Sequence, residues 1–116
     1  MAAIEFTETQ KAAIVSLLIE MINADGEVDP RECDVFNLIC VEQGIDDEVF
    51  GLGQRLDSFV ALDMMKRMSD LQKIATAQLL TRVIDADSND DDNEIRLFNL
   101  ICKSTGVDVL INARDE

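Results

Sequence analysis

The sequence predicts an all-α fold of about six to seven helices in a single domain over residues 1–116. Three observations support this prediction. Apolar residues recur with helical spacing in several segments, and no segment sustains the alternation of polar and apolar residues that is typical of a strand. Two stretches of the chain also repeat each other. A chain of 116 residues can bury a core that needs neither disulfides nor a metal.

The net charge of −14, from 24 acidic and 10 basic residues, indicates which partners are compatible with the surface. Nucleic acid is excluded, because phosphate binding needs a basic face. Cations or a basic protein are the expected partners. The longest apolar run, 12–19, is far shorter than the roughly 20 residues of a membrane span. The first residues lack a basic segment followed by an apolar stretch, which predicts no export signal and a cytoplasmic location.

Histidine is absent, and the cysteines number only three. Zinc sites and histidine-based catalysis are thereby largely excluded. Cys40 and Cys102 each end a repeated apolar segment, where a small buried thiol is expected rather than a disulfide.

Helix boundaries in the first half follow from capping signals. A Thr-x-x-Gln capping box at 7–10 begins a broad apolar helix that ends at 24–26. The second helix opens at 29–32, with Asp at the N-cap, Pro at the first helical position and Glu at the third, where it can bond back to the cap. Gly44 ends this helix, and Asp46 caps a short third one.

The second half is predicted in the same way. Residues 57–68 form a short fourth helix whose methionines fill core gaps rather than a partner groove. A Ser-x-x-Gln box at 69–72 begins a fifth helix that runs to about residue 85. A sixth helix covers about 92–104 and stops at Gly106. A final helical turn at 109–111 is expected to cover the core.

The second and sixth helices each have a predicted buried side. Their members are Cys33, Phe36, Leu38, Ile39 and Cys40 in one, and Leu97, Phe98, Leu100, Ile101 and Cys102 in the other.

An internal duplication connects the two halves. Residues 10–46 and 72–108 align without a gap at an offset of 62 and share seventeen of thirty-seven residues, including the segment Phe-Asn-Leu-Ile-Cys. Shared apolar positions and glycines could reflect the fold alone, but the matched acids at 25/87, 29/91 and 32/94 could not. We therefore predict two homologous helix–acidic-loop–helix hairpins that pack with approximate two-fold symmetry.

The acidic loops of these hairpins are the candidate functional site. Residues 85–94 carry six acids and no Lys or Arg. Two like charges 4 Å apart repel by about 1 kcal/mol even in bulk water, so a bound hard cation would stabilise the loop. The expected ion is Ca²⁺, with Mg²⁺ as the alternative. The candidate ligands are Asp25, Asp29 and Glu32 in the first loop, and Asp85, Asp87, Asp91 and Glu94 in the second.

Neither loop matches an EF-hand, although oxygen-bearing residues alternate in both. With Asp85 at position 1, Asp90 stands where the motif has Gly and Arg96 stands where it has the closing Glu. An alternative reading needs no metal. Acids at helix N-termini are favoured anyway, by roughly 0.3–1 kcal/mol each.

The stretch Ala-Asp-Gly-Glu-Val-Asp-Pro-Arg-Glu at 24–32 and its second copy at 86–94 each lead into an apolar helix that ends at Gly. In this pattern, over nearly its whole length, the chain resembles the TerB-like (tellurite-resistance TerB) family. The resemblance implies a small all-helical bacterial domain associated with tellurite and general stress resistance. It also implies acidic metal-binding loops and a role as a sensing or scaffold module.

The family's acidic motif matches this chain at Asp25, Gly26, Glu32, Asp87 and Glu94. The second loop departs from the family pattern. Ser88 stands where the family often has Gly, and Asp90 and Asp92 are additional acids.

Three classes of function are compared on these grounds. The first is a non-enzymatic stress-response domain that binds a divalent cation. The second is a metal-independent interaction module whose acidic face docks a basic partner. An enzyme is the third and least supported class, because acid–base catalysis needs carboxylates in a sheltered cleft and these acids are expected in solvated loops.

Overall fold

The computed structural model describes residues 4–24, 26–86 and 92–114. Within these ranges the chain is all-helical, which confirms the predicted fold class. The seven helices of the described ranges are α1 (Glu8–Ile22), α2 (Pro30–Gln43), α3 (Asp47–Arg55), α4 (Ser58–Lys66), α5 (Asp70–Asp85), α6 (Asp92–Thr105) and α7 (Val107–Arg114).

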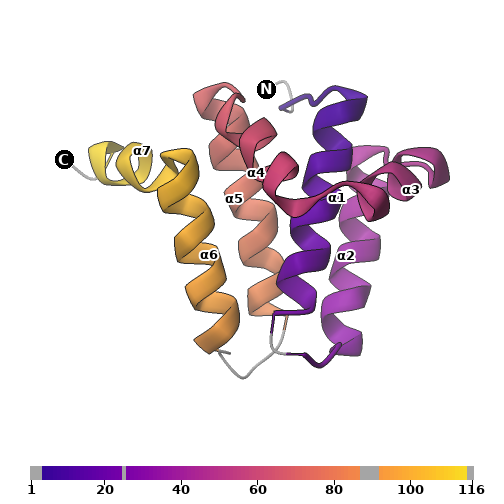
Figure 1. The fold of residues 1–116 in the computed structure, drawn as a ribbon. Helices are drawn as coiled ribbons and strands as arrows, with labels where there is room; N and C mark the ends of the chain where they lie inside the picture. Colours follow the sequence, from indigo (N-terminus) through magenta and orange to yellow (C-terminus); the bar gives the residue numbers. More distant parts are fainter. Residues whose placement is uncertain (1–3, 25, 87–91, 115–116) are drawn as a thin grey trace.

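Helices α1, α2, α5 and α6 stand side by side as two antiparallel hairpins (Figure 1). The two hairpins make equivalent contacts. Helix α1 contacts α2, and α5 contacts α6 in the other hairpin. Between the hairpins, α2 contacts α5, and α6 contacts α1. Helix α3, which follows the first hairpin, packs on α1, and α7, which follows the second, packs on α5. Helix α4 lies against α1, α5 and α6. The two-fold relation itself stays a prediction.

Hydrogen bonds between repeat-equivalent glutamines join the two hairpins. Gln10 Nε2 lies 3.3 Å from Gln72 Oε1, and Gln72 Nε2 lies 3.1 Å from Gln10 Oε1. The offset between these residues equals the offset of the repeat. The start of α1 therefore meets the start of α5 through the same side chain from each copy.

The predicted helix ends agree closely with the structure. Both capping boxes form, at Thr7 and Ser69, each with its glutamine bonded back to the cap. Asp29 is the N-cap of α2, with Pro at the first helical position. Gly44 and Gly106 adopt the left-handed conformation, with φ of +64° and +85°, that glycine reaches at low cost.

The core is centred on α1, which five other helices contact. Residues 12–18 of α1 are all buried. From α4 and its C-terminal side, Met65 and Met68 are buried, which confirms their predicted role as core filling. Among the described residues, no helix is both long and apolar enough to cross a membrane.

Some predicted core positions are wrong. Leu38 and Leu100, which are repeat-equivalent, are 51% and 59% exposed. A helix that packs on one side buries only one stripe of its surface. The repeated segment Phe-Asn-Leu-Ile-Cys is wider than this stripe, so the leucine of each copy faces solvent. The turn at 109–111 belongs to α7, but Val109 and Ile111 face solvent, whereas Val107 at the start of this helix is fully buried.

Candidate cation site at the acidic ends of the hairpins

In both hairpins, the helix ends on either side of the acidic connection lie at the same end of the bundle. The C-terminal ends of α1 and α5 and the N-terminal ends of α2 and α6 lie together at the bottom of Figure 1. Helices α2 and α6 therefore direct the positive ends of their dipoles toward the region where acidic residues are concentrated.

Asp29 caps a helix in the first hairpin. Its Oδ1 atom accepts a hydrogen bond from the backbone N–H of Arg31 at 2.8 Å, which caps α2. The Arg31 guanidinium also bonds the same carboxylate, with Nη2 3.0 Å from Oδ2. This neighbouring positive charge weakens the attraction of Asp29 for a cation. In the second hairpin, the position equivalent to Arg31 is the neutral Asn93.

Glu32 and Glu94 are the two acids that the structure places differently from the sequence prediction. Each retains only 1% of its exposed surface, in the first turn of α2 and of α6 respectively. The expectation that the loop acids are solvated is wrong for this pair. Both residues make interactions in the structure. Removing a carboxylate from water costs several kcal/mol, so full burial of two equivalent glutamates indicates a specific environment.

One sequence signal indicates a specific role for this pair. Between Asp29 and Glu32, the residues at the first two helical positions differ between the repeats, whereas the glutamate is the same. An N-terminal turn that only needed negative charge would accept Asp or Glu at any of its first positions. The presence of the same glutamate at the same position of both repeats therefore indicates that this position needs a fixed side-chain geometry.

Asp85 is the last residue of α5 and is exposed. A carboxylate at a helix C-terminus faces the negative end of the dipole, which is unfavourable by roughly 0.3–1 kcal/mol. A cation bound nearby would reverse this unfavourable interaction.

The other candidate ligands, Asp25, Asp87 and Asp91, lie outside the described residues. Within the described part of the chain, no group of three or more Cys, Asp or Glu side chains is arranged to hold a metal ion. Four candidates are thus placed: Asp29 at a cap, Asp85 at a helix end, and the two buried glutamates.

The cysteines form no metal-holding group with other ligands among the described residues. All three are free thiols. Burial raises the pKa of Cys40, and burial together with the nearby Asp108 carboxylate raises the pKa of Cys102. These two thiols therefore stay protonated at neutral pH, and a thiolate is the form that binds soft metals. Oxygen ligands remain the relevant donors.

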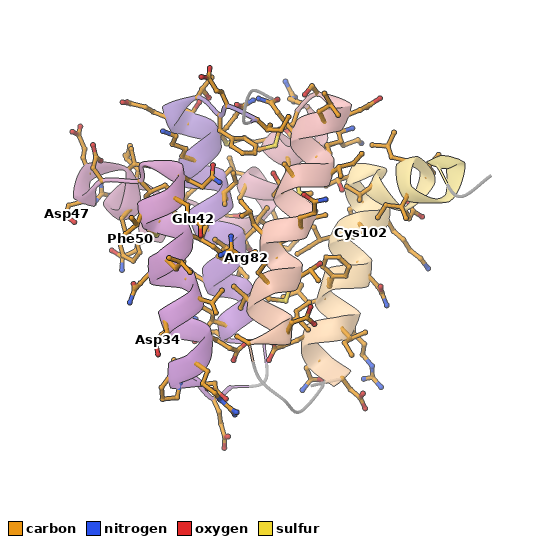
Figure 2. All side chains as sticks on the ribbon, turned by 180° about the vertical axis from the view of Figure 1, so that it is seen from behind. Asp34, Glu42, Asp47, Phe50, Arg82 and Cys102 are labelled. Carbon is orange, nitrogen blue, oxygen red and sulfur yellow. The ribbon has the colours of Figure 1, made fainter. Side chains whose placement is uncertain are left out.

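Away from the acidic end, a single ion pair joins the hairpins among the described residues. The Arg82 guanidinium on α5 binds the Glu42 carboxylate on α2 through two parallel contacts of 2.7 and 3.1 Å. Figure 2 shows the two side chains approaching each other, while Asp34 and Asp47 point outward. The hydrogen bond from Arg82 lowers the pKa of Glu42.

Comparison with known proteins supports the fold. No family model matches the chain, and no curated protein matches it. Among solved structures, the chain is similar to the crystal structure of PG1108, a protein of unknown function from Porphyromonas gingivalis W83. The TM-score is 0.77 and the identity 26%, over 90% of this chain and 88% of that one. Nearly the whole helical arrangement is therefore shared with this protein.

Proposed function

We propose that this chain is a non-enzymatic domain that binds a divalent cation at the acidic end of its two hairpins. The observation that carries the proposal is the pair Glu32 and Glu94, two repeat-equivalent carboxylates that are buried where the acidic loops enter α2 and α6. Buried carboxylates are rare unless they are paired or bound to a metal.

Hard oxygen donors favour Ca²⁺ first and Mg²⁺ second. Calcium accepts six to eight oxygen ligands in flexible geometry, so two loops of different sequence can each supply a site. The second hairpin is the stronger site, because it has more acids and no arginine at the position of Arg31. Its proposed ligands are Asp85, Asp87, Asp91 and Glu94, and those of the first hairpin are Asp25, Asp29 and Glu32.

The wider role that we propose rests on the resemblance to the TerB-like family. It is a cytoplasmic, bacterial sensing or scaffold module in tellurite or general stress resistance.

Isothermal titration calorimetry with CaCl₂ and MgCl₂ tests the cation site. We expect saturable heat for the wild type in the micromolar to millimolar range that calcium sites occupy. The double variant E32Q/E94Q keeps side-chain shape and should lose affinity about tenfold or more. Asp87→Asn with Asp91→Asn tests the second loop in the same way.

A matched control removes the same charge elsewhere. The double variant D47N/E48Q changes two exposed acids in the first turn of α3, away from the acidic end of the bundle. It should bind calcium as the wild type does. Absence of saturable heat at millimolar Ca²⁺ would contradict the proposal. Equal losses of calcium affinity in E32Q/E94Q and D47N/E48Q would contradict it as well.

A second candidate function is docking of a basic protein on the acidic face, without a metal. The net charge of −14 favours it. Capture of a basic protein that weakens with salt and persists in EDTA would support this candidate, and thermal stability would then be unchanged by Ca²⁺.

A further inference from the structure

An apolar groove runs between α4 and α6, and none of its lining residues is a candidate cation ligand. We call it the α4–α6 groove. Its volume is about 230 Å³. The groove is lined by side chains of three helices, among them Phe59 and Leu62 from α4, Leu97 and Leu100 from α6, and Leu17 and Glu20 from α1.

The rim of this groove exposes large apolar side chains. Phe59 is 81% exposed and Leu100 is 59% exposed. Next to them on α4, Val60 is 48% exposed. Single exposed apolar residues are ordinary, but a concave cluster of them is typical of an interaction site.

The opposite side of the bundle provides an internal comparison. There, Leu79 and Arg82 of α5 are the repeat counterparts of Leu17 and Glu20. The N-terminal segment of the chain lines that side with Ile4 and Phe6, and Phe6 is buried in the core.

On that side, the charged counterpart of Glu20 also has a partner of opposite charge within the chain. Arg82 makes its two-contact ion pair with Glu42 across α5 and α2. Thus an apolar segment and an opposite charge cover part of the α2–α5 side, which keeps a cavity of about 240 Å³. The N-terminal segment does not line the α4–α6 groove, and among the described residues the exposed Glu20 makes no hydrogen bond or ion pair.

We propose that the α4–α6 groove binds an amphipathic helix of a partner protein, with Lys or Arg beside its apolar stripe. The groove presents apolar residues at helical spacing on both walls, Leu97 with Leu100 and Phe59 with Leu62, which suits anchors at i, i+3 or i+4 and i+7 of a bound helix. A basic residue of the partner pairs with Glu20, the one charged side chain that lines the groove.

Charge distinguishes this occupant from a second copy of the chain. Two chains of net charge −14 repel each other, whereas the same charge attracts a basic helix and accelerates its encounter. The inference is independent of the cation site, because none of the residues of the groove belongs to the acidic loops.

The probe is a synthetic amphipathic peptide of Leu and Lys, with the leucines on one helical face, labelled for fluorescence anisotropy and titrated with the protein in EDTA. A peptide of the same composition with a scrambled leucine pattern measures binding by charge alone. We expect the patterned peptide to bind at least about tenfold more tightly than the scrambled one.

Variants locate the binding surface. F59S/L100S should weaken binding of the patterned peptide about tenfold or more, and E20K should weaken it several-fold while leaving the scrambled peptide less affected. The matched control is L38S, the same substitution at the repeat counterpart of Leu100, which should bind within about twofold of the wild type. Because these side chains are exposed, the variants should fold normally, as circular dichroism would verify.

Three results would overturn the inference. They are equal binding of the patterned and scrambled peptides, equal effects of L38S and F59S/L100S, and sedimentation showing a dimer that F59S dissociates. The last would assign the groove to a second copy of the chain. Loss of calcium binding in E32Q/E94Q would leave the peptide result unchanged, so each proposal can fail by itself.

Discussion

Helices α1 and α5 are repeat copies, yet they occupy different environments. Both begin with a capping box and place identical leucines in the core, at 17/79 and 18/80. Residues 12–18 of α1 are all buried, whereas in α5 Gln78 is exposed at the position of the buried Ser16. The repeated sequence therefore fixes the hairpin, and the unrepeated helices decide how deeply each hairpin is covered.

Helices α3 and α4 cover α1 closely. A Cβ atom at Gly53 of α3 would lie 2.5 Å from the Val15 side chain and 2.8 Å from the carbonyl oxygen of Ala12. The Ser16 hydroxyl donates a hydrogen bond of 3.1 Å to the carbonyl of Leu56. Small residues on α1 thus permit an approach that α5, with Ile74 and Gln78 at the positions of Ala12 and Ser16, does not offer.

The largest expected effects come from truncating the equivalent core leucines. Leu18→Ala and Leu80→Ala each remove a fully buried side chain and should cost about 2–5 kcal/mol of unfolding free energy. We expect the greater loss for Leu18→Ala, because α3 and α4 both pack on α1. Urea unfolding measures both. A greater loss for Leu80→Ala would show that α1 is not the central helix.

Gly53→Ala tests the close approach of α3. The added methyl group would overlap Val15 and the backbone of Ala12, so we expect a loss of about 1–3 kcal/mol. Gly51→Ala is the matched control in the same helix, since its Cβ would only touch the Arg55 side chain at 3.5 Å. That variant should be neutral or more stable by up to about 1 kcal/mol, because alanine favours helix. Equal effects would refute the proposed close contact.

Ser16→Ala should have a moderate effect. It deletes a buried hydroxyl and leaves the Leu56 carbonyl without this donor, which should cost about 1 kcal/mol. Gln78→Ala, at the equivalent exposed position of α5, should change stability little. Thermal or urea unfolding of both variants would show whether the repeat positions differ as the structure indicates.

The smallest effect is expected at the Arg82–Glu42 ion pair. The pKa of Glu42 is lowered in the folded state, so its contribution to stability is present above the ordinary glutamate pKa. This contribution is lost as the pH falls through the lowered pKa. Glu42→Gln should therefore differ from the wild type slightly at pH 7 and converge with it in acid. A difference that grows in acid would contradict this assignment.

Local signals in the sequence predicted the helix boundaries well. Capping boxes, the Asp-Pro start of α2 and the stop glycines act through neighbouring backbone groups, so they can be read without knowledge of tertiary packing. The tight packing of α3 at Gly53 could not be predicted, because it depends on a helix distant from that glycine in sequence.

The candidate site was predicted less completely than the fold. The sequence identified Glu32 and Glu94 as candidates by repeat and by charge, but it did not indicate their burial. The burial of a glutamate at a helix start depends on which other elements pack over it. Capping signals involve only neighbouring residues of the chain, so they do not predict this burial. For the same reason the exposure of Leu38 and Leu100 was missed, since an apolar residue in a helix can face either core or solvent.

The reciprocal hydrogen bonds between Gln10 and Gln72 have a consequence for the origin of the fold. A residue that meets its own repeat copy marks a place where two identical hairpins could be joined. In a homodimer of single hairpins, one glutamine from each subunit would make the same pair of bonds. Fusion of two such genes would keep this contact and free the remaining positions to diverge, as α1 and α5 have done.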